Sequence, residues 1–168
     1  PGRLYRFADT EKSAVVATLN GKPLDVKATN DGYLVLPKSV VAGDTVKLDF
    51  PMPVRKVISN PGVMDNRGKV AYQRGPLVYC FEGTDQAVKE VFSTVAGSNG
   101  SPKPVSDILG GITPIAVTAN AVKRVGLGGI TLGESLTLTG IPYATWANRG
   151  ASSMAVWLPG SIDAAEAP

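Results

Sequence analysis

Apolar and polar side chains alternate along much of the chain, in short runs that turn residues interrupt. Val46, Leu48 and Phe50 are apolar, and the polar residues Lys47 and Asp49 lie between them. A period of two places such residues on opposite faces of a β-strand, so this segment predicts one buried face and one hydrated face. Two prolines follow directly, and the strand is expected to bend or to run along a sheet edge there.

Turn residues connect the predicted strands. Asn20-Gly21 lies between two apolar runs and predicts a hairpin, because a type I′ turn needs positive φ at both central residues. Residues 70–82 are expected to form two strand halves that meet at Arg74-Gly75-Pro76. One short helix is predicted at residues 85–93, where three apolar residues have helical spacing. The pattern as a whole indicates an all-β fold, an antiparallel sandwich or barrel, and a β-sandwich of jelly-roll type is the fold we expect.

Composition narrows the possible functions. The chain has 168 residues and a net charge of +3, with its lysines and arginines scattered singly. No concentrated basic stripe points to nucleic acid, and no apolar run approaches the roughly 20 residues of a membrane span. The first residues contain neither a methionine nor a secretory pattern, so we expect a piece of a longer protein and leave its compartment open.

Histidine is absent and cysteine occurs once. This excludes an internal disulfide, cysteine-rich zinc modules and nucleophile–histidine pairs. The one cysteine, Cys80, lies in an apolar strand and is interpreted as a core residue. Glu82 and Asp85 could approach each other at the end of that strand, as a glycosidase pair does, but they are interpreted as solvated acids.

The aromatic cluster "IPYATWANRG" is the candidate binding site. Tyr143 and Trp146 could present flat faces to a sugar ring, with Asn148 and Arg149 as hydrogen-bond partners. The alternative is that Trp146 belongs to the core and that Arg149 closes a turn through backbone carbonyls. We expect a mostly buried Trp146 and a partly exposed Tyr143.

Several segments together resemble one enzyme family. The stretches "GYLVLPKSVVAGDTVKLDFPMPVRKV", "QRGPLVYC" and "IPYATWANRGASSMAVWLP" are similar, in this order, to the C-terminal region of glycoside hydrolase family 127, the β-L-arabinofuranosidase family. The resemblance extends from about residue 18 to residue 158. Val40 departs from it, since a tryptophan is expected there.

The resemblance implies a non-catalytic role. Members of the family have an α/α barrel that carries a catalytic cysteine, its partner glutamate and a zinc ion, followed by two β-sandwich domains. Residues 1–66 would then be the latter part of a first sandwich and residues 67–168 a second one. No catalytic residue, metal ligand or cofactor is expected in this chain, and its partner would be the N-terminal barrel of the parent glycoside hydrolase.

Two other functions stay open. A carbohydrate-binding module also uses a β-sandwich, and it would need exposed aromatic side chains on one face. A purely structural or interaction domain would not. The exposure of Tyr143 and Trp146 distinguishes these two possibilities.

Overall fold

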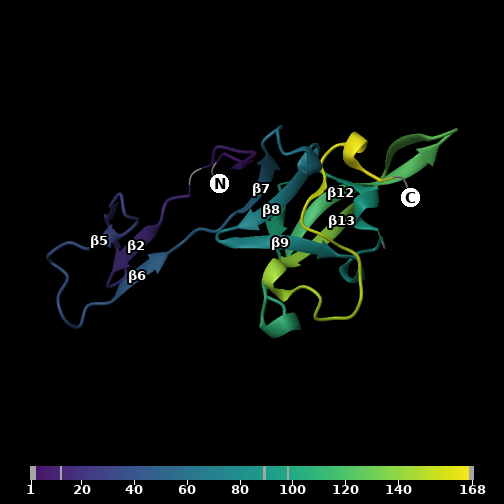
Figure 1. The fold of residues 1–168 in the computed structure, drawn as a ribbon. Helices are drawn as coiled ribbons and strands as arrows, with labels where there is room; N and C mark the ends of the chain where they lie inside the picture. The colour runs from purple at the N-terminus through teal and green to yellow at the C-terminus, as the bar shows by residue number, and fades with distance from the viewer. Residues whose placement is uncertain (1–2, 12, 89, 98, 167–168) are drawn as a thin grey trace. The chain divides into compact units, whose positions relative to one another are not determined.

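The computed structural model describes residues 3–11, 13–88, 90–97 and 99–166 (Figure 1). The chain divides into two compact units. The large unit comprises Pro1–Thr10 and Pro53–Pro168, and the small unit comprises Glu11–Met52. The described residues are predominantly strands and turns, and every strand pairing is antiparallel. The predicted all-β class is confirmed.

The large unit contains one ten-stranded sheet, in which the order is β1-β7-β8-β9-β13-β12-β10 and three short strands pair at its sides. Its strands are β1 (Tyr5–Phe7), β7 (Val54–Ser59), β8 (Lys69–Arg74), β9 (Leu77–Glu82), β10 (Thr94–Ala96), β11 (Ser101–Pro102), β12 (Ile115–Val125), β13 (Gly129–Pro142), β14 (Met154–Ala155) and β15 (Leu158–Pro159). Short 3-10 turns connect them: η1 (Met64–Asn66), η2 (Gly83–Asp85), η3 (Val91–Ser93), η4 (Ile108–Gly110), η5 (Tyr143–Thr145) and η6 (Ile162–Ala164).

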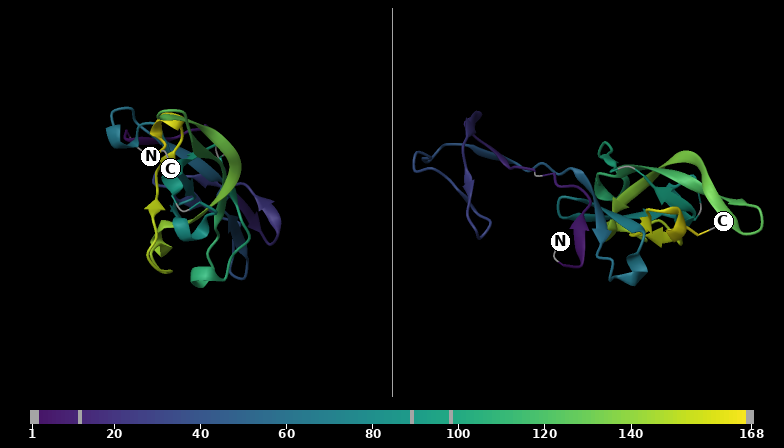
Figure 2. Two further views of the ribbon diagram at one scale, coloured as in Figure 1. Left: turned by 90° about the vertical axis from the view of Figure 1, so that its right-hand side faces the viewer. Right: turned by 90° about the horizontal axis from the view of Figure 1, so that it is seen from above.

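Strands β12 and β13 form a long curved hairpin (Figure 2). Gly126 and Gly128 at its tip have φ of +56° and +102°, which glycine adopts without steric cost. Gly140 allows β13 to pack closely on the core, because a Cβ there would lie 2.8 Å from Ile115. The hairpin and β8–β9 together enclose the core, whose largest fully buried side chains include Tyr72, Tyr79, Phe81, Ile115 and Leu138.

The small unit contains a three-stranded sheet of order β3-β2-β6 and the separate pair β4-β5. Its strands are β2 (Val16–Leu19), β3 (Lys22–Leu24), β4 (Lys27–Ala28), β5 (Leu34–Val35) and β6 (Val46–Asp49). Asn20 and Gly21 connect β2 to β3 with φ of +49° and +79°, so the predicted hairpin is confirmed. Strand β6 lies at the edge of this sheet, as predicted, and ends before the two prolines.

The helix predicted at 85–93 is wrong for the described residues, although residue 89 lies outside them. Two 3-10 turns, η2 and η3, flank an extended Gln86 instead. The Gln86 side chain donates to the carbonyls of Glu82 and Thr139, and its Oε1 accepts from the Thr139 N–H. A two-turn helix is only marginally stable, so these contacts with β13 determine the local conformation.

The domain boundary predicted after residue 66 concerns the longer protein and stays a prediction. Within this chain, β7 pairs with β8 along five residue pairs, from Val54↔Arg74 to Ile58↔Val70. Residues 53–66 therefore belong to the same compact unit as residues 67–168. The predicted jelly-roll arrangement of the sheets likewise stays a prediction.

Candidate functional site

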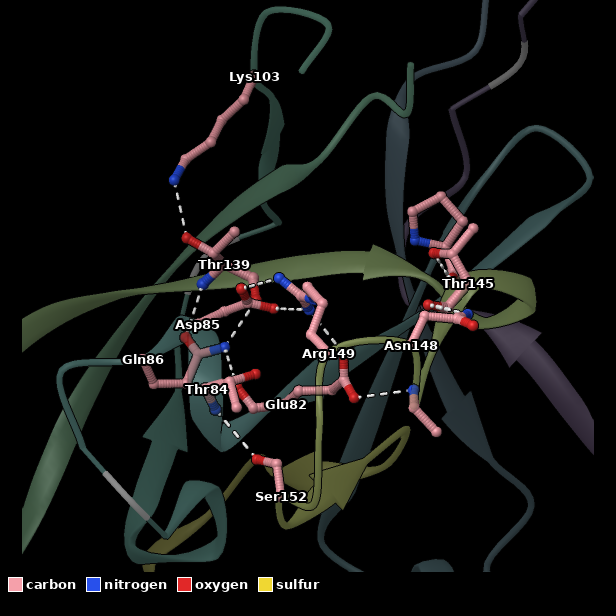
Figure 3. Close-up of polar contacts among 12 residues, drawn as sticks. Glu82, Thr84, Asp85, Gln86, Lys103, Thr139, Thr145, Asn148, Arg149 and Ser152 are labelled. Atoms are coloured by element: carbon pink, nitrogen blue, oxygen red, sulfur yellow. Dashed lines mark hydrogen bonds and ion pairs between the residues drawn. The ribbon is translucent and has the colours of Figure 1, made fainter. Parts of the chain in front are cut away.

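An arginine and two carboxylates form the main ionic cluster of the large unit (Figure 3). Arg149 Nη2 donates to Glu82 Oε2 at 2.6 Å and to Asp85 Oδ2 at 2.5 Å, and Nη1 donates to Asp85 Oδ1. Glu82 ends β9 and is only 2% exposed. Hydrogen bonding to Asp85, and then to Glu82, raises the pKa of the Arg149 guanidinium above its usual value. The predicted contact of Arg149 with backbone carbonyls is therefore wrong.

The cluster holds the loop that follows β13. The second oxygen of Glu82, Oε1, accepts from the Ala147 N–H at 3.0 Å, so both carboxylate oxygens are engaged. Asn148 Nδ2 donates to the carbonyls of Thr145 and Trp146, at 3.1 Å each. Asn148 and Arg149 thus stabilise the loop itself, through Nδ2 of Asn148 and the two terminal nitrogens of Arg149 (Figure 3).

This carboxylate pair is unsuited to glycoside hydrolysis. A glycosidase pair needs space between the two acids for the sugar, and often for a water molecule as well. Here one guanidinium occupies the space between Glu82 and Asp85, and Glu82 is buried. The sequence interpretation of Glu82 as a solvated acid is wrong, because the buried part of β9 continues past Cys80 to this residue.

Cys80 is fully buried in β9, as the sequence predicted. Its neighbours along the strand, Tyr79 and Phe81, are buried too. Burial, with a smaller contribution from the negative charges of Glu82 and Asp85, raises the pKa of the Cys80 thiol to about 12. A nucleophilic cysteine needs the opposite shift, so this geometry fits a packing role.

Tyr143 and Trp146 lie at the surface of the same loop. They are 45% and 41% exposed, their ring centroids are 6.1 Å apart and their planes differ by 15°. The partial exposure of Tyr143 is confirmed, and the predicted burial of Trp146 is wrong. The burial prediction failed because the loop bends away from β13 through η5, where Thr145 Oγ1 donates to the Pro142 carbonyl at 2.7 Å.

A groove of about 700 Å³ begins beside Tyr143. We call it the aromatic groove; its lining residues are Asp65, Asn66, Lys69, Val78, Phe92, Tyr143, Met154, Ala155, Val156 and Trp157. Sequence reasoning missed its polar residues, Asp65, Asn66 and Lys69. Asp65 and Asn66 belong to η1 between β7 and β8, Lys69 begins β8, and no spacing in the sequence relates them to Tyr143.

The parts of the chain that the structure describes contain no group of three or more His, Cys, Asp or Glu residues that could hold a metal ion. Among the same residues, no helix has the length and apolar character needed to cross a bilayer. The expectation that this chain carries no cofactor stays a prediction.

Comparison with known proteins gives a consistent result. Residues 54–159 match the family described as the glycoside hydrolase family 127 C-terminal domain. The chain is 32% identical to a non-reducing end β-L-arabinofuranosidase of Bifidobacterium longum subsp. longum over 166 residues. That alignment covers 90% of this chain and 25% of the relative, so the chain spans about a quarter of that enzyme.

Solved structures of the same family have the same fold. A GH127 β-arabinofuranosidase superposes with a TM-score of 0.83 at 37% identity, covering 99% of this chain and 26% of that one. A GH127 β-L-arabinofuranosidase from Geobacillus stearothermophilus T6 gives a TM-score of 0.67 at 29% identity, covering 87% and 24%. The family match, the relative and these structures agree, and the chain belongs to the C-terminal domain family of glycoside hydrolase family 127.

Proposed function

We propose that this chain is the accessory C-terminal part of a longer family 127 glycosidase and that it stabilises the catalytic part by packing against it. The longer enzyme would hydrolyse β-L-arabinofuranosides, the substrates that the names of its relatives state. The observation that carries the proposal is the family match over residues 54–159 in a chain that spans a quarter of its relative.

The geometry of the large unit supports a non-catalytic role. Its buried cysteine has a raised pKa, and its buried carboxylate is paired on both oxygens. A surface suited to packing is present at the same time, since Tyr143 and Trp146 are exposed on a loop that Arg149 holds in place. Rigid exposed aromatic side chains are typical anchors of protein interfaces.

Truncation of the longer enzyme tests this proposal. Removing the residues that correspond to this chain should lower the melting temperature of the remaining protein and its activity on an aryl β-L-arabinofuranoside. Thermal unfolding and initial rates, measured on the intact and truncated proteins, provide the comparison. A truncated protein with unchanged melting temperature and rate would contradict the proposal.

Direct contact with a sugar is the second candidate function, and the near-parallel exposed rings of Tyr143 and Trp146 favour it. Asp65, Asn66 and Lys69 of the aromatic groove would supply hydrogen bonds in place of Asn148 Nδ2 and the terminal nitrogens of Arg149, which already have partners in the chain. Such a combination of flat rings and a few polar groups is typical of ligand sites.

Calorimetric titration with arabino-oligosaccharides tests the sugar site. Binding should occur with the parent chain and disappear in Trp146→Ala. Tyr33→Ala is the matched control, because Tyr33 is an exposed aromatic residue of the small unit. Absence of binding to the parent chain, or binding that Trp146→Ala retains, would contradict this function.

A further inference from the structure

A second hollow of the large unit adjoins the aromatic groove. Its volume is about 380 Å³, and its lining residues are Tyr5, Val57, Ala71, Tyr72, Gln73, Val78, Val156 and Trp157. We call it the tyrosine hollow. Three of its lining residues, Val78, Val156 and Trp157, also line the aromatic groove. Because both hollows lie within the large unit and share these residues, they form one continuous concave surface.

One face of strands β7, β8 and β9 forms the floor of this surface. Residues directly opposite each other in an antiparallel pair share a face, and here Val57 pairs with Ala71 and Gln73 with Val78. Lys69 lies on the same face of β8 as Gln73, because the two residues are four positions apart. A strand rises about 3.3 Å per residue, so Lys69 in the groove and Gln73 in the hollow are about 13 Å apart. This separation exceeds the width of a single sugar ring.

Aromatic rings line the surface at both ends and where the two hollows meet. Tyr143 lines the aromatic groove and stacks on Trp146. Tyr5 lines the tyrosine hollow, and its ring centroid is 5.4 Å from that of Trp157, with 34° between the planes. Trp157 belongs to both hollows, and Tyr5 and Trp157 are each partly buried. The rings therefore offer several successive stacking positions for one extended ligand.

The polar groups between these rings favour a neutral, hydroxyl-rich occupant. One acid, Asp65, and one base, Lys69, are the charged residues of the combined lining, so the surface attracts neither anions nor cations strongly. Gln73 Nε2 donates to the Gly75 carbonyl at 2.8 Å, which leaves its Oε1 to accept a hydrogen bond from a ligand. An apolar protein surface would desolvate Asp65 and Lys69 without giving them partners. A sugar chain presents C–H faces to the rings and hydroxyl groups to the polar side chains.

We propose that the aromatic groove and the tyrosine hollow together bind an extended neutral oligosaccharide chain, which contacts Tyr143 at one end and Tyr5 at the other. This inference rests on the second candidate function, direct contact with a sugar, and extends it from one sugar ring to a chain. Once the first sugar unit is bound, each further unit binds at a high effective concentration. Affinity accordingly increases with chain length until the surface is filled.

Calorimetric titration with ligands of increasing length tests this inference. The probes are linear α-linked arabino-oligosaccharides, from the disaccharide to the octasaccharide, which a β-specific glycosidase does not cleave. For the 168-residue chain, Kd should fall with ligand length and then become constant. Tyr5→Ala should weaken binding of the octasaccharide about twofold to tenfold, the value of one aromatic contact, and leave binding of the disaccharide unchanged. Tyr33→Ala, in the small unit, is again the matched control and should change neither.

Tryptophan fluorescence gives a second measurement that needs no substitution in the tyrosine hollow. The chain has two tryptophans, so Trp146→Phe keeps a ring at that position and leaves Trp157 as the one fluorophore. The octasaccharide should change the emission of Trp157, and the disaccharide should change it less, because Trp157 lies where the two hollows meet. This comparison decides the question if Tyr5→Ala fails to fold.

Equal affinity for all ligand lengths, with binding that Trp146→Ala still abolishes, would overturn the chain inference and leave the sugar site standing. Absence of binding at every length would overturn both. The same titrations in the longer enzyme identify a competing occupant: length-dependent binding that is lost there would overturn the inference, because polypeptide would then cover the tyrosine hollow. The truncation experiment above is independent of these outcomes, since it measures stabilisation of the catalytic part without any ligand.

Discussion

The two units of this chain follow the same strand pattern and differ in what covers their apolar faces. In the large unit, β8, β9 and the β12–β13 hairpin enclose a core in which Tyr72, Phe81 and Leu138 are fully buried. In the small unit the paired residues also alternate correctly, but Leu48 and Phe50 stay exposed. Alternation therefore predicts which face of a strand is apolar, and it does not predict whether this chain supplies the second layer.

Strand length explains much of this difference. Strands β12 and β13 have 11 and 14 residues, and the hairpin curves around the core. The strands of the small unit have two to four residues each. Short strands can form hydrogen-bonded hairpins locally, but they bury little apolar surface without a second layer. The small unit is ordered by turns, and the large unit is ordered by its core.

The largest expected effect comes from breaking the ionic cluster of the large unit. Arg149→Met leaves Glu82 buried without its counter-charge, which should lower the free energy of unfolding by about 3–5 kcal/mol. Urea denaturation followed by tryptophan fluorescence measures this, because both tryptophans lie in the large unit. Glu82→Gln in the Arg149→Met background should recover part of the loss, because it removes the unpaired charge.

The control for this prediction is the exposed pair Lys123–Glu134, whose charged atoms are 3.6 Å apart. Lys123→Met should change the free energy of unfolding by less than about 1 kcal/mol, as is usual for surface ion pairs. If Arg149→Met has an equally small effect, the cluster does not organise the loop after β13.

A paired leucine substitution compares the two units directly. Leu138→Ala empties a fully buried position and should cost about 2–5 kcal/mol in the same denaturation experiment. Leu48→Ala removes an exposed side chain from β6 of the small unit and should cost less than about 1 kcal/mol in the 168-residue chain, measured by urea denaturation followed by far-UV circular dichroism because the small unit has no tryptophan. A large cost for Leu48→Ala would show that Leu48 is already covered in the isolated chain.

Much of the fold was predictable from local sequence signals. The turns at Asn20-Gly21 and Arg74-Gly75-Pro76 and the buried Cys80 depend on residues close in sequence, and the structure confirms them. The predicted buried face of β6 is wrong for this chain, because Leu48 and Phe50 are exposed. The helix at 85–93 was wrong because Gln86 makes its hydrogen bonds with Thr139, which is distant in the sequence. Tertiary contacts of this kind override a weak helical period.

The site was less predictable than the fold. The loop residues Tyr143 and Trp146 were identified by their chemistry, but the exposure of Trp146 depends on where η5 directs the loop. The roles of Glu82 and Arg149 depend on a hydrogen bond between two residues that are 67 positions apart in the sequence. The functional prediction depended on the resemblance to family 127, because no local motif in this chain indicates a catalytic reaction.

The rate of thiol labelling at Cys80 compares the folded large unit with its unfolded form. The burial of Cys80 and its raised pKa of about 12 predict slow reaction with a thiol reagent at neutral pH. A raised pKa favours the protonated thiol over the reactive thiolate, so the thiol is the populated form of Cys80 at pH 7. Labelling should accelerate strongly in urea, and mass spectrometry follows it. Rapid labelling of the folded chain would mean that β9 opens frequently.

Trp146→Ala should have a smaller effect on stability than a core substitution. The side chain is partly exposed and stacks on Tyr143, so the expected loss is about 0.5–1.5 kcal/mol, the usual value of an aromatic pair. Thermal unfolding followed by far-UV circular dichroism measures it. A loss as large as that of Leu138→Ala would show that Trp146 belongs to the core in solution.

The smallest expected effect concerns the hydrogen bonds of Asp44 in the small unit. Asp44 accepts hydrogen bonds from the Val41 N–H at 2.9 Å and from Asn20 Nδ2 at 2.8 Å, and these bonds, Val41 first, lower the pKa of Asp44 below its ordinary value. A lowered pKa stabilises the folded unit above the ordinary pKa, and this contribution is lost as pH falls through the lowered value.

Titration of the Asp44 carboxyl carbon by NMR measures this pKa directly. Asn20→Gly keeps the positive φ of the turn but removes the amide donor, so the pKa of Asp44 should rise partway towards its ordinary value while the Val41 bond remains. Because Asp44 lies in the small unit and both tryptophans lie in the large unit, the shift should be seen without any change in the tryptophan-detected unfolding. An Asp44 that titrates at or above its ordinary value would mean that the β2–β3 turn and the loop before β6 do not hold each other in the isolated chain. The small unit would then lack even the local order that distinguishes it from an unfolded segment.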